Sequence, residues 1–190
     1  MSSSQLPPGQ RWVDRPIVYD VAPAGPVDLA SFRLRLHGAV RRPLEFSWTD
    51  LQALPRTRVA RDFHCVTAWS VRAIPWEGVL TAELVGRVEP DSDANWVLAR
   101  GRDGYSTLVP LDAFAASDSL VAYRMADAPL LPEHGYPLRL VVPSLYAWKS
   151  AKYLDELEFL RAPVRGFWEA RGYHDRGDPW KEERYRGGIS

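Results

Sequence analysis

Short apolar segments of strand length run through the chain, and turns rich in Pro and Gly separate them. The pattern predicts strands at residues 32–38, 58–66, 95–99, 106–109, 121–125 and 138–142. Short helices are predicted at residues 49–54 and 78–88, with a helical turn at 111–116. Because many short strands are interrupted by short helices, the sequence favours an α+β domain over a doubly wound sheet.

Local signals define several of these elements. Residues 32–38 alternate between apolar and polar side chains, which places the apolar ones on a single buried face. Thr49 or Asp50 is predicted to cap the helix that follows, and Pro55 is predicted to end it. A loop at residues 74–76 is then predicted to lead into the next helix.

The chain is of a length that favours one domain. It has 190 residues, of which 46% are hydrophobic, enough to build a sizeable core. We expect an extended N-terminal arm at residues 1–30, a globular domain at 31–165 and a C-terminal tail at 166–190. The tail combines aromatic residues with dense charge, so we expect it to pack on the surface of the domain.

Charge and motifs exclude several classes of function. The 24 basic and 24 acidic residues balance, so no overall field favours nucleic acid or an anionic membrane as a partner. No apolar run approaches the ~20 residues that span a bilayer, and residues 1–10 lack the features of a signal peptide. We therefore expect a cytoplasmic protein. The sequence motifs of P-loops, dinucleotide-binding folds, serine hydrolases and zinc proteases are absent.

Cys65 is the only cysteine, so the chain can form neither an intrachain disulfide nor a multi-cysteine metal site. It lies at the end of a predicted strand, beside small and hydroxyl residues. Three interpretations are open: a buried small hydrophobe, a thiolate nucleophile, or a soft ligand to a transition metal. Adjacent side chains on a strand point to opposite faces, so His64 is poorly placed to act as a base for Cys65.

Basic residues form a second candidate site. Arg139 lies in an otherwise apolar strand, and Lys149 and Lys152 follow at a spacing of three. If their segment is helical, the two lysines share one face. Arg with a nearby Lys can hold a phosphate, whereas the alternative is a pair of solvated surface lysines. His134 precedes the strand, and the Gly after it lets the backbone approach a ligand closely.

The order of four motifs resembles the molybdopterin-binding domain of the sulfite oxidase family, most closely its small bacterial branch. The pattern is also similar to the catalytic subunit of the molybdenum methionine-sulfoxide reductases. The motifs are DFHCVTAWS at 62–70, IPW at 74–76, EHGYPLRLVVP at 133–143 and YAWKSAKYL at 146–154. The resemblance covers roughly residues 6–185.

This resemblance implies an α+β fold of mixed sheets and short helices around one molybdenum–molybdopterin cofactor. It implies that Cys65 is the protein's ligand to molybdenum and a catalytic residue, since the cofactor supplies the remaining ligands. The other residues that the resemblance places at the cofactor are His64, His134, Arg139, Ser150, Ala151 and Lys152. Arg139 and Lys152 would hold the pterin and its phosphate.

The function implied is an oxidoreductase that transfers an oxygen atom to or from a small substrate, such as a sulfoxide, an N-oxide or a sulfite-like anion. Tyr105 is predicted to offer a hydroxyl to that substrate. An external redox partner protein would exchange the electrons, because no haem, flavin or iron–sulfur motif is present. Two alternatives remain: a non-catalytic module that binds a phosphorylated ligand or a protein, and a thiol-dependent hydrolase or transferase that uses Cys65.

Overall fold

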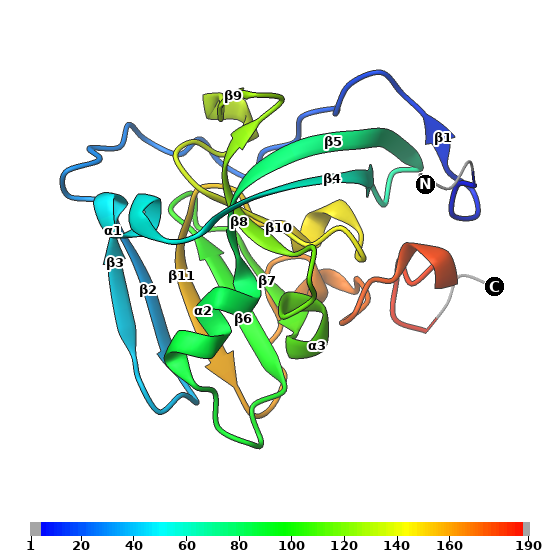
Figure 1. Ribbon diagram of the computed structural model, residues 1–190. Coiled ribbons are helices and arrows are strands. Elements are labelled where there is room, and N and C mark those ends of the chain that lie inside the picture. Colours follow the sequence, from blue (N-terminus) through cyan, green and yellow to red (C-terminus); the bar gives the residue numbers. More distant parts are fainter. Residues whose placement is uncertain (1–4, 188–190) are drawn as a thin grey trace.

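Two β-sheets form the framework of the computed structural model, which describes residues 5–187 (Figure 1). The six-stranded sheet contains β1 (Arg11–Trp12), β4 (Arg56–His64), β5 (Trp69–Leu80), β8 (Leu120–Met125), β9 (Ala128–Pro129) and β10 (Arg139–Val141). The five-stranded sheet has the order β3 (Leu44–Ser47), β2 (Arg33–Gly38), β11 (Leu154–Leu160), β6 (Trp96–Gly101) and β7 (Ser106–Pro110). Residues 1–4 of the predicted arm and 188–190 of the predicted tail lie outside the described residues.

Helices are short and lie between strands. They are α1 (Trp48–Ala53), α2 (Thr81–Val88), α3 (Leu111–Phe114) and the 3₁₀ helices η1 (Pro132–His134), η2 (Ala147–Lys149), η3 (Glu169–Arg171) and η4 (Pro179–Lys181). Both sheets are mixed: β11 runs parallel to β2 and antiparallel to β6, and β1 runs parallel to β5. The predicted α+β class is confirmed. None of the helices in residues 5–187 has the length and apolarity to cross a membrane.

The alternating segment forms β2 as predicted, with Leu34 and Leu36 buried and Arg33 and Arg35 exposed. The first helix also forms, but its predicted cap is wrong. Ser47 caps α1 by accepting a hydrogen bond from the backbone of Asp50, whose carboxylate in turn accepts one from the Ser47 backbone. The reciprocal pair satisfies two amide groups that the helix leaves free.

The predicted loop at residues 74–76 is wrong, because these residues continue β5. Pro75 is tolerated there because its carbonyl accepts from Ala126, just beyond the end of β8. The N–H that proline lacks would point the same way as this carbonyl. It would lie just beyond the paired residues of β5 and β8, so the ladder loses no hydrogen bond. Helix α2 therefore begins at Thr81, three residues later than predicted. Gly78 belongs to the strand and packs so closely on β8 that a Cβ there would lie 2.0 Å from the Val121 oxygen.

Strand β11 has no counterpart among the predicted elements, although it occupies the middle of its sheet. Leu157 and Phe159 are fully buried on one side of it. Its acidic residues are neutralised by neighbouring strands: Glu156 pairs with Arg35 on β2 and Arg100 on β6. These cross-strand ion pairs let a strongly charged segment form a central strand.

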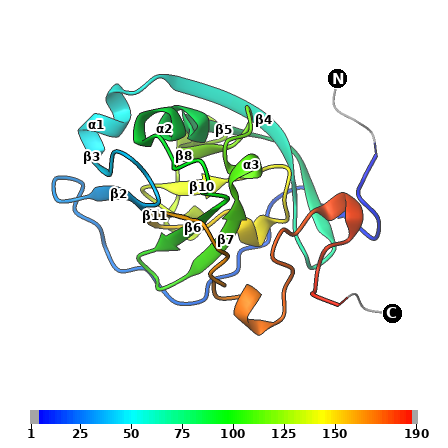
Figure 2. The same ribbon diagram turned by 90° about the horizontal axis from the view of Figure 1, so that it is seen from below.

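The ends of the chain meet at one end of the sheets. In Figure 2 the C-terminal segment lies beside the turn between β4 and β5, and the N-terminal segment passes close to both. Arg184 donates a hydrogen bond to the carbonyl of Val66 in this turn, and Gln10 donates one to the carbonyl of Cys65 at 3.0 Å. The division of the chain at residues 30 and 165 stays a prediction.

Candidate functional site

Cys65 lies in the tight turn between β4 and β5. Its amide donates to the Trp69 carbonyl at 2.8 Å, and its carbonyl accepts from Ala68 at 3.1 Å. Ala68 adopts a left-handed conformation with φ of 70°, which closes the turn. Because Gln10 and Arg184 hold the same turn from the two ends of the chain, the sulfur has a fixed position.

The environment of the Cys65 thiol disfavours the free thiolate. Burial raises its pKa, and the hydrogen bond to Thr67 and the charge of Arg184 oppose this only in part. The sulfur lies 3.2 Å from Thr67 Oγ1. A nucleophilic cysteine needs a depressed pKa, so the thiol-hydrolase interpretation loses support. A metal ligand does not, because a bound metal itself displaces the thiol proton.

A cavity of about 370 Å³ opens beside Cys65. Six of the eight predicted site residues line it: Cys65, Tyr105, His134, Arg139, Ser150 and Lys152. These residues come from four separate parts of the chain, which the two sheets bring to one end of the molecule. The structure therefore joins the two candidate sites of the sequence, the thiol and the basic residues, in one pocket.

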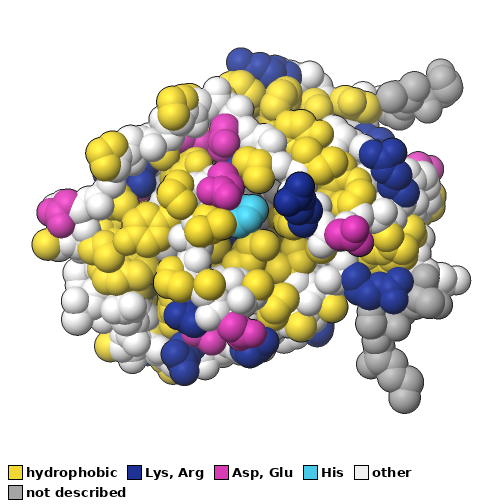
Figure 3. Space-filling model, turned by 90° about the horizontal axis from the view of Figure 1, so that it is seen from above, with side chains coloured by type: hydrophobic (Ala, Val, Ile, Leu, Met, Phe, Trp, Pro, Cys, Tyr) yellow, Lys and Arg dark blue, Asp and Glu magenta, His cyan; other side chains and the backbone are white. Residues whose placement is uncertain are grey.

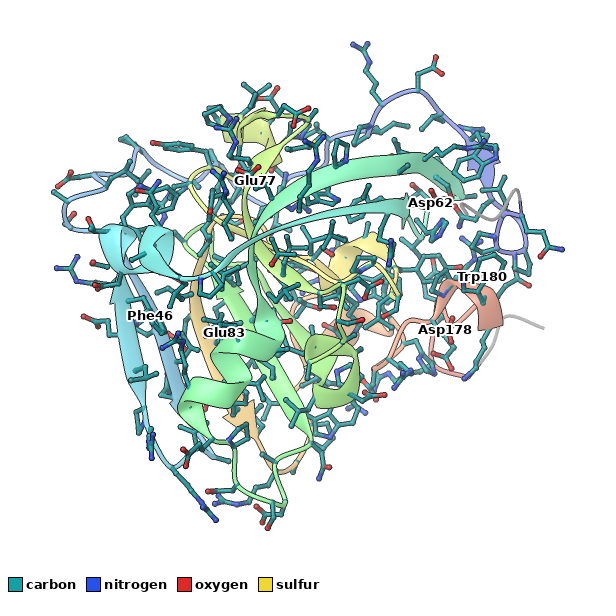
Figure 4. The ribbon with its side chains drawn as sticks, in the orientation of Figure 1. Phe46, Asp62, Glu77, Glu83, Asp178 and Trp180 are labelled. Atoms are coloured by element: carbon teal, nitrogen blue, oxygen red, sulfur yellow. The ribbon has the colours of Figure 1, made fainter. Side chains whose placement is uncertain are left out.

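His64 and Ala151 do not line this cavity. The Nδ1 of His64 lies 2.8 Å from Ser70 Oγ, and its ring faces Trp180 at 6.2 Å. Figure 4 shows Trp180 beyond the end of β4. Ala151 is 1% exposed in the core, where its carbonyl accepts from Leu140 at 2.8 Å. As neighbours on a strand end, His64 and Cys65 face opposite ways, as predicted.

Arg139 is a buried cation with no counterion among the described residues. Its guanidinium donates to the carbonyls of His134 and Ser150, both at 3.1 Å, and lies over the ring of Trp76 at 5.0 Å. Across residues 5–187 no carboxylate forms an ion pair with it. Burial lowers its pKa to about 10, so the side chain is still charged at neutral pH. Buried charges are ordinarily paired, and this one lines an open cavity.

The two lysines do not share a helix face, because the segment is not helical as far as Lys152. Helix η2 ends at Lys149, whose side chain is fully buried and forms an ion pair with Glu169 at 2.5 Å. Lys152 lies beyond the helix and lines the cavity. It donates to the carboxylate of Asp20 and to the carbonyls of Tyr19 and Glu133 at 2.8 and 3.1 Å.

The loop before β10 places His134 at the cavity next to Arg139. Burial and the charge of Arg139 lower the pKa of His134, which favours a neutral imidazole. The close backbone approach predicted at Gly135 occurs, but toward Lys152: a Cβ there would lie 2.9 Å from that of Lys152. The glycine therefore lets the loop pack on the lysine.

Tyr105 contributes its ring to the cavity wall. Its hydroxyl donates to the carbonyl of Trp148 at 2.6 Å and is buried. Burial raises the pKa of this phenol well above its ordinary value, and the charge of Glu169 adds to the effect. The hydroxyl is engaged with the backbone, although its role toward a substrate stays a prediction.

Several cavity residues have no counterpart in the sequence-based prediction. Residues 16–21 of the N-terminal segment lie along the pocket, and Trp168 and Tyr173 of the C-terminal segment form another part of its wall. Figure 3 shows one face of the molecule on which apolar side chains predominate and a histidine lies beside acidic and basic side chains. Within the described part of the chain, no three His, Cys, Asp or Glu side chains gather as a metal site.

Two known proteins are similar to this chain in sequence. The chain is 42% identical over 158 residues to the uncharacterized oxidoreductase YuiH of Bacillus subtilis, covering 83% of this chain and 80% of that one. It is 26% identical to the methionine-sulfoxide reductase catalytic subunit MsrP of Campylobacter jejuni, covering 74% of this chain and only 52% of MsrP.

A solved structure shows the same fold. The sulfane dehydrogenase SoxCD of Paracoccus pantotrophus matches with a TM-score of 0.67 at 24% identity, over 74% of this chain and 41% of that chain. The sequence model described as the oxidoreductase molybdopterin binding domain matches residues 21–168. The chain therefore belongs to the molybdopterin-binding oxidoreductases, a family of enzymes that includes relatives of MsrP.

Proposed function

We propose that the chain is a molybdenum-dependent oxidoreductase that moves an oxygen atom to or from a small substrate. One observation carries the proposal: the only thiol of the chain and a buried, unpaired guanidinium line the same cavity. A soft sulfur suits a transition metal, and an unpaired buried cation suits an anionic group. A metal bound to a phosphorylated pterin offers a transition metal to the sulfur and an anionic group to the cation.

The residues present fit such a cofactor. Cys65 offers one sulfur from a rigid turn, which suffices where the cofactor brings the other metal ligands. Arg139 offers a charged fork to the pterin side, and Lys152 offers a point charge to a phosphate. The ammonium of Lys152 now contacts Asp20, Tyr19 and Glu133, so holding a phosphate requires it to exchange one of these contacts.

When bound, the cofactor supplies a molybdenum ion that changes oxidation state by two while oxygen is transferred. For a sulfoxide, the S–O bond breaks, and two electrons with two protons from solvent convert the oxygen to water and leave the sulfide. The reverse balance applies to oxidation of a substrate. The chain's part is to hold the metal through Cys65, to fix the pterin through Arg139 and to limit access of water through the cavity walls.

The electrons come from a second protein with a redox group of its own. The cavity is bordered by residues 16–21, where Ile17, Val18 and Tyr19 are partly exposed. These exposed apolar side chains offer an electron carrier a surface on which to dock beside the cavity. We propose a one-electron carrier of the haem or flavin class.

Cofactor content tests the proposal directly. Protein purified from molybdenum-replete cells is expected to contain about one molybdenum and one pterin per chain, measured by elemental mass spectrometry and by the fluorescence of the oxidised pterin. It should reduce sulfoxides or N-oxides with an artificial electron donor, or oxidise a substrate with an artificial acceptor. A purified protein that lacks both metal and pterin, but binds a phosphorylated ligand, would instead support the non-catalytic alternative.

Removing either cation of the cavity is expected to lower cofactor affinity. Lys152→Ala and Arg139→Ala each delete a charge-assisted hydrogen bond of about 1.5–3 kcal/mol, so we expect roughly ten- to hundredfold weaker retention of the pterin. The measurement is pterin content after dialysis, at equal protein concentration. Lys181→Ala is the matched control, since that lysine is exposed and lies outside the cavity. Equal pterin retention in all three variants would contradict the assignment.

A further inference from the structure

The C-terminal segment is built into the cavity wall. Gly166 packs against β7 so tightly that a Cβ would lie 2.5 Å from the Ser106 oxygen, and the amide of Phe167 donates to the same oxygen at 2.8 Å. Two residues later Glu169 enters the core and pairs with Lys149. The segment that carries Trp168 is therefore fixed on both sides.

Tyr173 is held next to Trp168 by a backbone turn. Helix η3 ends at Arg171, and Gly172, with a φ of 100°, turns the chain back. The Tyr173 amide then donates to the Trp168 carbonyl at 3.1 Å. The ring of Tyr173 then lies 5.0 Å from that of Trp168 and 5.2 Å from that of Trp148. These three rings, which we call the aromatic wall, all line the cavity.

The aromatic wall lies at the Cys65 end of the cavity. The amide of His174, next to Tyr173, donates to the Arg184 carbonyl at 3.1 Å, and the Arg184 side chain donates to the carbonyl of Val66, the residue after Cys65. A phenol can accept one hydrogen bond while it donates another. The single proton of Tyr173 is held toward Tyr185, so donation into the cavity requires the phenol to turn and to accept from Tyr185 instead.

The charged side chains of the lining gather around Lys152. Lys152 contacts Asp20 and the backbone of Glu133, and it interacts electrostatically with Arg139 and Asp103. These five residues are the Lys, Arg, Asp and Glu side chains that line the cavity among the described residues. Arg184 is close to the thiol but does not line the cavity. Its side chain donates to the Val66 carbonyl and lies over the ring of Tyr146 at 5.3 Å. Around Cys65 the lining is neutral and rich in aromatic rings.

We propose that the aromatic wall is the substrate side of the cavity, and that it selects neutral oxo compounds with an apolar or aromatic substituent. Trp148 and Trp168 contact the substituent, and the Tyr173 hydroxyl donates a hydrogen bond to the oxygen that is transferred. An inorganic oxyanion finds no cation in this part of the lining. The inference rests on the proposed function, because it takes Cys65 as the metal-binding end.

Substrate kinetics of the cofactor-loaded enzyme test the wall. With an artificial electron donor, Trp168→Leu is expected to raise the KM for methyl phenyl sulfoxide about tenfold and to change that for dimethyl sulfoxide less than twofold. Tyr173→Phe is expected to lower kcat/KM about tenfold for both substrates, in keeping with the loss of one hydrogen bond. Trp180→Leu and Tyr123→Phe are matched controls, since both residues lie outside the cavity lining.

A binding measurement separates this inference from the proposed function. Methyl phenyl sulfone, an unreactive analogue, is titrated into each purified protein by calorimetry, and molybdenum content is measured on the same samples. We expect Trp168→Leu to bind the sulfone about tenfold more weakly at unchanged molybdenum content. Equal sulfone affinity in the native and Trp168→Leu proteins would overturn the inference, as would a native enzyme with a higher kcat/KM for sulfite than for methyl phenyl sulfoxide. Absence of molybdenum and pterin would overturn the proposed function, whatever the sulfone result.

Discussion

Replacement of Cys65 by serine is expected to lower oxygen-transfer turnover at least a hundredfold while the fold is retained. The hydroxyl is a poor ligand for a soft transition metal, whereas the thiolate is a strong one. Serine nearly keeps the size of the side chain and can still bond to Thr67, so little of the packing in the turn is lost. The pterin contacts of Arg139 and Lys152 also remain, and we expect the variant to retain most of its pterin.

Turnover, pterin content and circular dichroism of Cys65→Ser and native protein are the measurements. Alkylation gives a readout that does not depend on activity, because Cys65 is the only thiol. Iodoacetamide should modify the native protein stripped of cofactor and leave the loaded protein largely unmodified, as followed by intact mass. Native-like turnover in Cys65→Ser, or full alkylation of the loaded protein under conditions that alkylate the stripped protein, would show that the sulfur does not bind the metal.

The strands found from sequence are those whose pattern reports burial on one face. β2 alternates cleanly because one side of it is exposed, and β6 and β7 are separated by an Asp-Gly turn. β11 was not predicted, because its acidic residues pair with arginines on other strands and a local sequence pattern does not show such partners. β5 was not predicted, because Pro75 is typical of a loop, although in the structure it lies where the ladder needs no N–H.

In the candidate site, too, some residues could be predicted from the local sequence and others only from the fold. Cys65 and Arg139 stand out locally, one as the only thiol and the other as a charge in an apolar strand, and the structure brings both to the cavity. Trp168 and Tyr173 reach the cavity only through long-range packing, and no local pattern distinguishes them from other aromatic residues of the tail. Lys149 looked equivalent to Lys152, because only the fold shows that one is buried against Glu169.

Loss of the Lys149 side-chain charge is expected to have the largest effect on stability. Lys149 and Glu169 are both fully buried, and the ammonium also donates to the carbonyls of Leu108 and Asp175 at 2.7 Å. The carboxylate of Glu169 accepts from Thr107 at 2.8 Å. Removing one partner of such a pair leaves the other charge buried and uncompensated, which typically costs about 3–5 kcal/mol.

Lys149→Met should therefore lower the free energy of unfolding by about 3–5 kcal/mol, which corresponds to a fall in Tm of roughly 10 °C for a chain of this size. Thermal unfolding is compared at equal cofactor content, because a bound cofactor stabilises the folded state.

In the double variant Lys149→Met/Glu169→Leu neither charge of the pair remains, so its loss of unfolding free energy should be smaller than the sum of the losses in the two single variants. Lys181→Met, which removes an exposed lysine, is the control and should change stability by less than about 0.5 kcal/mol. If Lys149→Met unfolds at the native temperature, the ion pair does not hold the C-terminal segment against the sheet, and the aromatic wall would need another anchor.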